Sequence, residues 1–250
     1  MLLYQPSTGY RYNSDSIFLY DFIRAFRPRG KLMDVGCGVG VISLLLARDF
    51  PVEVTLVEKQ PRMLAYARHN FVIHGIEAEA IEGDFLHVPP EGSFDFIVSN
   101  PPFYDPRVSQ SEDPVLNTAR YAQHLPLEPF VERVRRLLHP RGWFILCYDA
   151  KQSDRLLQAL LRAKLIPEQV RYVHPKIDRE AKIVLVAARA NSRSLCRVLP
   201  PLVVFDERGK YRKEAEQAFR HARTQAVTGE MESLNEKREM RNEKLQERFL

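Results

Sequence analysis

The tetrapeptide Asn100-Pro101-Pro102-Phe103 follows a short apolar segment, and its residue types suit a specific kind of chemistry. The two prolines fix φ and donate no N–H, so nearby carbonyl oxygens are left free and rigidly aimed. The side-chain oxygen of Asn100 adds a second acceptor, and two acceptors that converge on one point suit an NH2 group. Phe103 offers a ring on which a flat substrate can stack. The alternative interpretation is a Pro-Pro pair that only terminates a strand.

A converging pair of acceptors can activate a planar amine. The lone pair of an exocyclic amine or an amide is delocalised, so the nitrogen is a poor nucleophile. Accepting both N–H protons favours a pyramidal nitrogen, and the same oxygens stabilise the positive charge that attack creates. The sequence therefore predicts that Asn100, Pro101, Pro102 and Phe103 form a catalytic corner for attack by an amine nitrogen.

A glycine-rich turn, DVGCGVG (34–40), follows the first apolar strand. Its glycines let the backbone approach a ligand, and we expect free N–H groups to point at that ligand. The spacing Gly36-x-Gly38-x-Gly40 differs from the G-x-G-x-x-G of dinucleotide sites. Glu58 ends the next strand, where a carboxylate can accept hydrogen bonds from both hydroxyls of a ribose. Asp84, after the third strand, is expected to reach an adenine amino group, with Phe85 against the ring.

The elements that position these residues alternate along the chain. Hydrophobic periodicity predicts strands at 31–36, 52–59, 78–85, 94–100, 143–149, 169–174 and 181–189, and helices at 39–50, 60–75, 126–142 and 151–165. This alternation implies a mostly parallel sheet with helices on both faces. The short connection between the last two strands predicts an antiparallel pair at one edge.

Three segments fall outside this alternation. In the lead-in, residues 1–30, Ser14 or Asp15 is expected to cap a helix that covers the site. Residues 104–125 form a long polar connection, a functional lid or a disordered segment. The sequence thus divides into the lead-in, a central domain at 31–210, and a charged tail at 211–250. The tail is expected to be a solvated helix, a partner-binding arm for a homo-oligomer or another protein, or disordered.

The composition places bounds on the class of protein. The 250 residues carry a net charge of +5 with three widely spaced cysteines. No cysteine or histidine spacing suits a metal, so we expect no metal and no disulfide. The N-terminus has no signal-peptide layout, and no apolar run reaches the roughly 18 residues of a membrane span. These features predict a cytoplasmic protein.

The glycine turn together with the two acids resembles the Rossmann-like class I methyltransferases that use S-adenosylmethionine. The resemblance implies an α/β fold with a mostly parallel seven-stranded sheet, an antiparallel edge pair and helices on both faces. The charged C-terminal tail, expected to be helical, is a departure from the family and inherits no role from it. It implies S-adenosyl-L-methionine as cofactor, with Asp34 near its methionine part. Asp34 could instead cap a turn or helix, and Cys37 is expected to be only a small side chain. The cofactor-binding residues would include Asp34, Gly36, Cys37, Gly38, Gly40, Glu58, Lys59, Asp84, Phe85 and Asn100.

NPPF resembles the Asn-Pro-Pro-aromatic motif of amino-methyltransferases, which act on adenine N6, guanine N2 or a protein glutamine. The segments GYRYNSDSIFLYDFI, ARYAQHLPLEPFVERVRRLLHPRGWFIL and PPLVVFDERGKY are similar to the bacterial tRNA adenine-N6 methyltransferases, which act beside the anticodon of a valine tRNA. The likeness runs from about Gln5 to Tyr211. It implies that Arg11, Asn13 and Asp15 line the mouth of the cofactor pocket, although each could be a cap or surface group. A cofactor-binding, RNA-associated protein without turnover stays an alternative.

A basic segment supports a phosphate-bearing partner such as tRNA. Residues 162–197 hold nine Lys or Arg against three acids, while the rest of the chain is close to neutral. Within it we expect Lys176, Arg179 and Lys182 to contact substrate. Phe103, Tyr104 and Arg120, after the strand that NPPF ends, are expected to touch the target nucleotide. A solvated basic face that binds nothing is the alternative.

Overall fold

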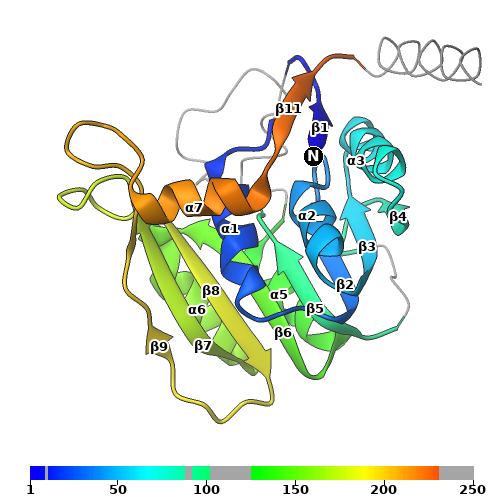
Figure 1. The fold of residues 1–250 in the computed structure, drawn as a ribbon. Helices are drawn as coiled ribbons and strands as arrows, with labels where there is room; N and C mark the ends of the chain where they lie inside the picture. Colours follow the sequence, from blue (N-terminus) through cyan, green and yellow to red (C-terminus); the bar gives the residue numbers. More distant parts are fainter. Residues whose placement is uncertain (9–10, 88–91, 102–124, 231–250) are drawn as a thin grey trace, which may run out of the picture.

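The computed structural model describes residues 1–8, 11–87, 92–101 and 125–230. Its centre is a mixed sheet whose seven long strands lie in the order β4-β3-β2-β5-β6-β8-β7 (Figure 1). In chain order these strands are β2 (Gly30–Val35), β3 (Val52–Glu58), β4 (Ala78–Glu82), β5 (Phe94–Ser99), β6 (Leu138–Asp149), β7 (Leu165–His174) and β8 (Ile183–Ala190). Two-residue strands, β9 (Arg197–Val198) and β10 (Leu202–Val203), pair with β7. The expected fold class is confirmed.

Strand direction decides which loops share an edge of the sheet. Strands β2 to β6 run parallel to one another. Strand β8 is antiparallel to both β6 and β7, as the short connection predicted. Because β7 therefore runs in the same direction as β6, the loop after β7 lies at the same edge as the ends of β2, β3 and β5. That edge is where ligands bind in open α/β sheets.

Helices cover both faces of the sheet (Figure 1). One face carries α1 (Ser14–Arg24), α2 (Val41–Asp49) and α3 (Pro61–Ile73). The other carries α5 (Leu127–Leu137) and α6 (Ser153–Arg162), the latter preceded by the 3-10 helix η2 (Ala150–Gln152). Burial on two sides explains why the central strands are apolar runs rather than alternating patterns.

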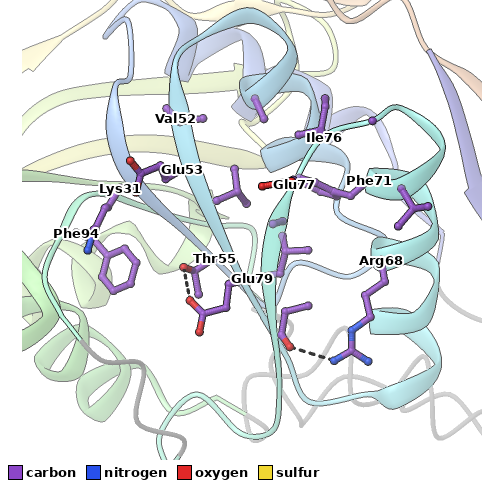
Figure 2. A pocket seen from close by; sticks show the side chains of 17 residues that line it. Lys31, Val52, Glu53, Thr55, Arg68, Phe71, Ile76, Glu77, Glu79 and Phe94 are labelled. Carbon is purple, nitrogen blue, oxygen red and sulfur yellow. Dashed lines mark hydrogen bonds between the residues drawn. The ribbon is translucent and has the colours of Figure 1, made fainter.

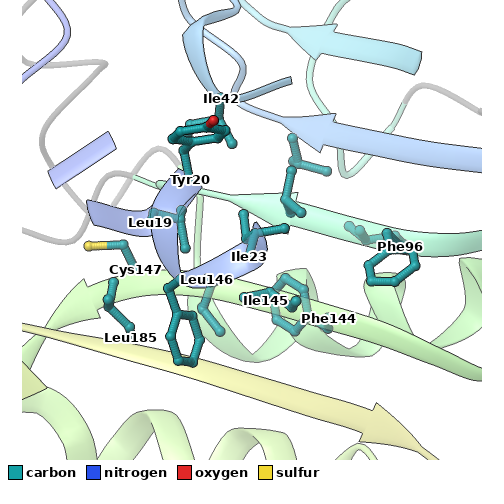
Figure 3. Close-up of a cluster of buried hydrophobic side chains, with 14 of the residues drawn as sticks. Leu19, Tyr20, Ile23, Ile42, Phe96, Phe144, Ile145, Leu146, Cys147 and Leu185 are labelled. Atoms are coloured by element: carbon teal, nitrogen blue, oxygen red, sulfur yellow. The ribbon is translucent and has the colours of Figure 1, made fainter. Parts of the chain in front are cut away.

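The main core lies between α1 and the strands beneath it. Figure 3 shows Leu19 and Ile23 of α1 in one cluster of buried side chains with Leu146 of β6 and Leu185 of β8. All four side chains are at most 1% exposed. Each buried aliphatic side chain of this size contributes about 1.5–3 kcal/mol, so α1 is fixed firmly over the sheet.

Two local boundaries differ from the sequence expectation. The helix predicted at 126–142 ends at Leu137, because Leu138 already pairs with Phe94 of β5. Arg141 then adopts a left-handed φ of 71° where the register of β6 shifts. At α1 the cap is Asn13, whose Oδ1 accepts from the N–H of Asp15 at 3.1 Å, rather than Ser14 or Asp15.

The ends of the described chain meet on one side of the domain. Strand β1 (Leu2–Gln5) pairs in parallel with β11 (Gln225–Thr228), and α7 (Lys213–Ala222) packs against α1 (Figure 1). Arg48 of α2 donates to the carbonyls of His221 and Ala222 at the end of α7. The first part of the charged tail is thus joined to the domain, and residues 231–250 lie outside the described residues.

Candidate active site

The glycine turn connects β2 to α2 at the carboxyl edge of the sheet. Gly36, Gly38 and Gly40 all have positive φ, at 67°, 56° and 78°, a region that side chains rarely adopt. Gly40 is also tightly packed, since a Cβ there would lie 3.2 Å from the ring of Phe71 and 3.3 Å from the Cβ of Ala67. The glycines therefore serve both the sharp turn and the close approach of α2 to α3.

Four N–H groups of this turn are not free, contrary to the sequence expectation. Those of Gly36 and Cys37 donate to the carbonyl of Val57, and that of Gly40 to the carbonyl of Cys37. The N–H of Gly38 donates to the carboxylate of Glu58 at 2.9 Å. The turn thus provides room for a ligand rather than an anion cradle, which suits a cofactor without phosphate.

Glu58, at the end of β3, is held by backbone groups. One carboxylate oxygen accepts from Gly38 N, and the other accepts from Gln60 N at 2.9 Å. The residue is 7% exposed, and its burial raises the pKa although these hydrogen bonds oppose the shift. The backbone N–H of Lys59 also bonds to this carboxylate, and the lone pair that remains can accept a hydrogen bond from a ribose hydroxyl.

Asp34, near the end of β2, lies beside the same turn and is buried. Its Oδ2 accepts from the hydroxyl of Ser43 at 2.7 Å and from the N–H of Ser43 at 3.3 Å. These bonds tie β2 to the first turn of α2, which is the capping role left open above. Burial raises the pKa of Asp34 to about 6, even though the bonds from Ser43 act in the opposite direction. The pKa of the neighbouring Cys37 thiol is raised well above its usual range by burial, so this thiol is a poor nucleophile.

Asp84 and Lys59 form an ion pair beside Glu58. Asp84 accepts from Lys59 Nζ and from Leu86 N, each at 2.9 Å. Partial burial works to raise the pKa of Asp84, but the hydrogen bond from Lys59 and the other favourable contacts outweigh it and lower the pKa. Phe85, predicted to lie against an adenine ring, points into the core, where its ring centroid is 5.7 Å from that of Phe130.

Asn100 follows β5, immediately beside β2 and its glycine turn. Its Nδ2 donates to the hydroxyl oxygen of Ser16 on α1 at 3.2 Å. Its Oδ1 is buried and has no hydrogen-bond partner among the described residues. Pro101 is buried next to it. An unpaired buried acceptor is uncommon in folded proteins and calls for a functional explanation.

The start of α1 contributes the three residues expected at the pocket mouth. Arg11 and Asn13 are exposed, and Asp15 is half-buried. Burial raises the pKa of Asp15, opposed by hydrogen bonds from Asn13 and Ser14. Asn13 and Asp15 thus bond to each other in a helix cap. Asp15 directly precedes Ser16, which accepts a hydrogen bond from Asn100.

One pocket of the molecule is separate from this site. It has a volume of about 1030 Å3 and lies along β3 and β4, away from the glycine turn. Figure 2 shows the polar side chains around it, among them Glu53, Thr55 and Arg68. Its lining includes none of the predicted cofactor or substrate residues.

The geometry agrees with comparisons to known proteins. A family model described as the methyltransferase small domain matches residues 13–163, which include the glycine turn, Glu58, Asp84 and Asn100. The chain belongs to this methyltransferase family. Its cofactor is S-adenosyl-L-methionine, which supplies an electrophilic sulfonium methyl group when bound.

Individual relatives of this methyltransferase differ in what they modify. A tRNA1(Val) (adenine(37)-N6)-methyltransferase from Phocaeicola vulgatus is 28% identical over 189 residues, which cover 74% of this chain and 79% of that protein. A release factor glutamine methyltransferase from Deinococcus radiodurans is 31% identical over 153 residues, 58% of this chain and 54% of that protein. A crystal structure of a predicted O-methyltransferase from Agrobacterium tumefaciens has a TM-score of 0.66 at 17% identity, covering 85% of this chain and 99% of that one. The structural likeness shows the shared fold.

The structure brings most of the predicted cofactor residues to one edge of the sheet. Asp34, Gly36, Gly38, Glu58, Lys59, Asp84 and Asn100 lie at or directly after the ends of β2, β3, β4 and β5. Predicted residues Pro102, Phe103, Tyr104 and Arg120 lie outside the described residues. Sequence reasoning missed Ser16, because a serine in a helix carries no signal of a partner 84 positions away.

The described residues hold neither a membrane-spanning helix nor a metal-binding cluster. Residues 1–8, 11–87, 92–101 and 125–230 contain no helix long and apolar enough to cross a membrane. The same ranges contain no group of three or more His, Cys, Asp or Glu arranged to hold a metal ion.

Proposed function

We propose that this methyltransferase transfers a methyl group to the N6 amine of an adenine in tRNA. The observation that carries the proposal is the unpartnered Oδ1 of Asn100, which lies buried at the carboxyl edge of the sheet beside the glycine turn. Such an oxygen is poised to accept a hydrogen bond from a ligand, and it is the acceptor that an amine nucleophile requires.

Asn100 acts on the nitrogen and not on the leaving group. By accepting an N–H proton in a hydrogen bond, Oδ1 pulls the amine out of conjugation and frees its lone pair. As the nitrogen becomes positive, the amide oxygen stabilises the charge, and its fixed position avoids a reorganisation cost. A carbonyl of the Pro-Pro pair is the proposed second acceptor. The cationic product nitrogen is acidic and loses its proton to solvent, so no strong general base is required.

Two adjoining loops at the same edge suit an RNA backbone. The β7–β8 hairpin carries Lys176, Arg179 and Lys182, of which Arg179 and Lys182 are exposed. The loop after β10 brings Arg208 and Arg212 beside it, and Lys176 Nζ donates to the carbonyl of Glu207 at 3.2 Å. Phosphate contacts position a nucleic acid without reading its sequence, which fits this mixture of exposed cations.

A turn with internal hydrogen bonds stiffens the second loop. Asp206 Oδ1 accepts from the N–H groups of both Arg208 and Lys210 at 2.9 Å. The rings of Phe205 and Tyr211 pack with centroids 4.9 Å apart. The cations therefore project from a preformed scaffold, which lowers the entropy that RNA binding must overcome. Arg208 and Arg212 are proposed substrate contacts that the sequence alone did not single out.

The choice of adenine in tRNA rests on the relative that matches the greater share of both chains. The alignment with the tRNA1(Val) enzyme covers 74% of this chain, whereas the alignment with the release factor enzyme covers 58%. An anticodon loop also suits a deep acceptor corner, because its unpaired bases can be turned into a pocket at low energetic cost.

The deciding experiment offers three substrates to the same protein. Total tRNA lacking the modification, ribosomal RNA and a release factor are each incubated with methyl-labelled cofactor, and the products are analysed as nucleosides or peptides. Label in N6-methyladenosine from tRNA supports the proposal. Label in methylguanosine or in a glutamine peptide instead overturns the adenine assignment, and no label with any substrate favours the non-catalytic RNA-associated alternative.

A further inference from the structure

Asn70 of α3 joins two parts of the molecule that are far apart in the sequence. Its Nδ2 donates to the carbonyls of Val39 and Tyr4, each at 2.9 Å, and its Oδ1 accepts from the N–H of Tyr4 at 2.8 Å. Val39 belongs to the glycine turn, and Tyr4 belongs to β1. A carbonyl cannot donate and a backbone N–H cannot accept, so these three contacts allow only one orientation of the amide.

The carbonyl that Asn70 holds lies in the middle of the cofactor turn. Val39 stands between Gly38 and Gly40, both of which have positive φ, so no regular strand or helix fixes the chain there. Asn70 is 0% exposed and Val39 is 2% exposed. Leaving a buried carbonyl without a partner costs about 1–3 kcal/mol, a cost that the turn can reduce by moving. The bond from Asn70 therefore helps to keep the turn in the position that leaves room for the cofactor.

Strand β1 brings a C-terminal segment of the chain to the same junction. It lies between β11, with which it pairs in parallel, and α3 (Figure 1). Beyond β11, the N–H of Gly229 donates to the carbonyl of Gln5 at 3.2 Å, and the carbonyl of Gly229 accepts from the hydroxyl of Tyr66 on α3 at 2.6 Å. Residues 224–230, named here the C-terminal strap, are thus attached to α3 both directly and through β1.

Apolar side chains from the same four segments pack together. Val39 of the glycine turn forms a small buried cluster with Met63 and Tyr66 of α3, and Tyr4 of β1 and Val227 of β11 pack against it. The hydrogen bonds of Asn70 therefore lie within a packed junction rather than at an open surface. The turn, α3, β1 and the strap form one unit.

We propose that Asn70 is a positioning residue that holds the glycine turn in its cofactor-binding position, and that the C-terminal strap supports it through β1. Asn70 touches no cofactor in this scheme and acts through the carbonyl of Val39. Its loss should weaken cofactor binding without changing the rate of methyl transfer once cofactor is bound. The inference concerns only the cofactor of the family, so it does not depend on the adenine assignment.

The main test is calorimetry with S-adenosyl-L-methionine alone, which needs no methyl acceptor. We expect Asn70→Ala to raise the cofactor Kd about tenfold, the scale of one unmade hydrogen bond to a buried group. Asn70→Val should do the same. Alanine leaves room for a water molecule and valine fills that room with apolar atoms, so agreement between them excludes an effect of packing alone. A Kd within about twofold of the wild type in both variants would overturn the proposal.

Two truncations test the strap. The chain without residues 231–250 keeps β11 and every contact named above, and it is the reference. Removing residues 224–250 leaves β1 without its partner strand and should raise the cofactor Kd about threefold to fivefold, less than Asn70→Ala because Asn70 remains. Adding Asn70→Ala to the longer truncation should give about the Kd of Asn70→Ala alone. If the two effects multiplied, the strap and Asn70 would act independently and the coupling would be wrong.

Leu160→Ala is the control for general destabilisation. Leu160 is fully buried in α6, which covers the opposite face of the sheet from α3. Its truncation costs about 2–5 kcal/mol of stability, which is on the scale of losing the bonds of Asn70. Below its melting temperature, this variant should bind cofactor with the Kd of the wild type. An equal rise in Kd here would mean that lost stability, and not the position of the turn, explains the Asn70 variants.

The catalytic rate gives a second readout. With the acceptor that the substrate comparison identifies, Asn70→Ala at saturating cofactor should keep its kcat within about twofold of the wild type, while the cofactor KM rises with Kd. A large fall in kcat with an unchanged Kd would place the effect in methyl transfer and overturn the proposal. If no acceptor is methylated, the proposed function fails, and the calorimetry still decides the role of Asn70.

Discussion

The carboxylates at the ends of β2, β3 and β4 and the amide after β5 differ in their hydrogen bonding. Asp34 and Asp84 each accept two hydrogen bonds within the protein, and Glu58 accepts three. The oxygen of Asn100 accepts none from the described residues. The proposed cofactor side is thus preorganised by internal contacts, whereas the proposed acceptor side has one buried oxygen without a partner among the described residues.

This difference follows from what each side must do. A group that binds a cofactor gains from being fixed beforehand, since less order has to be imposed on binding. A group that accelerates a reaction must interact more strongly with the transition state than with anything present earlier. Leaving a buried acceptor unpaired costs about 1–3 kcal/mol, and that cost is removed when an amine arrives.

The largest expected effect comes from removing the buried oxygen of Asn100. Asn100→Ala should lower methylation by about 100-fold to 1000-fold, the range seen when one preorganised hydrogen-bonding group is lost from a charge-stabilising site. Cofactor affinity should stay within about threefold, because Glu58 and Asp84 are untouched. Turnover of labelled cofactor on tRNA and calorimetry with cofactor alone measure the two quantities separately. Retention of more than a tenth of the activity would contradict the acceptor mechanism.

Glu58→Ala should give the reverse pattern. Loss of a carboxylate that accepts a hydrogen bond from a ribose hydroxyl is expected to weaken cofactor binding about 10-fold to 100-fold, since hydrogen bonds to charged groups are worth about 1.5–3 kcal/mol. The turnover at saturating cofactor should remain within a fewfold of the wild type. Calorimetry decides the matter. Unchanged affinity would refute the ribose assignment. Glu58→Gln keeps one acceptor oxygen, so its cofactor affinity should lie between those of the wild type and Glu58→Ala.

Sequence patterns predicted the sheet and most of its edge residues, for a physical reason. Strands β2, β3 and β5 are buried on both faces, so each is a short apolar run that stands out from its surroundings. Parallel pairing brings their ends together, so the sequence alone predicts that Glu58 and Asn100 lie at one edge.

Contacts between distant segments could not be predicted in this way. Strand β1 pairs with β11 over more than 220 positions, and neither strand has more than four residues. The hydrogen bond from Asn100 to Ser16 likewise depends on how α1 is seated on the sheet. The N–H groups of the glycine turn were assigned wrongly because the spacing of glycines does not reveal that Val57 and Glu58 already accept from them.

A smaller effect is expected at the proposed RNA surface. Lys176→Ala, Arg179→Ala and Lys182→Ala should each raise the RNA Kd about threefold to tenfold and lower the slope of log K against log salt by about one. Arg193→Ala is the control, because Arg193 belongs to the same basic segment but follows β8 at the opposite edge. Filter binding over a range of salt concentrations measures the slopes. Equal losses in all four variants would indicate only general attraction to a basic protein.

The last effect concerns stability rather than activity, and it separates two of the carboxylates by sign. Burial raises the pKa of Asp34 from its ordinary 3.8 to about 6, so its contribution to stability is present below pH 3.8 and is lost as the pH rises through 6. Asp34→Asn keeps an acceptor for Ser43 without the charge. Relative to the wild type, it should gain stability between pH 4 and pH 7, by roughly 3 kcal/mol at most.

Asp84→Asn should respond in the opposite sense. The pKa of Asp84 is lowered, so its stabilising contribution is present above the ordinary value and is lost as the pH falls through the lowered one. The variant should therefore be less stable than the wild type at pH 7 and approach it only in acid. Thermal unfolding measures the two trends, from pH 4 to pH 7 for Asp34→Asn and from pH 7 to well below pH 3.8 for Asp84→Asn. If the two variants changed stability in the same direction, the distinction between Asp34, a buried carboxylate that ties β2 to α2, and Asp84, a carboxylate paired with Lys59, would be wrong.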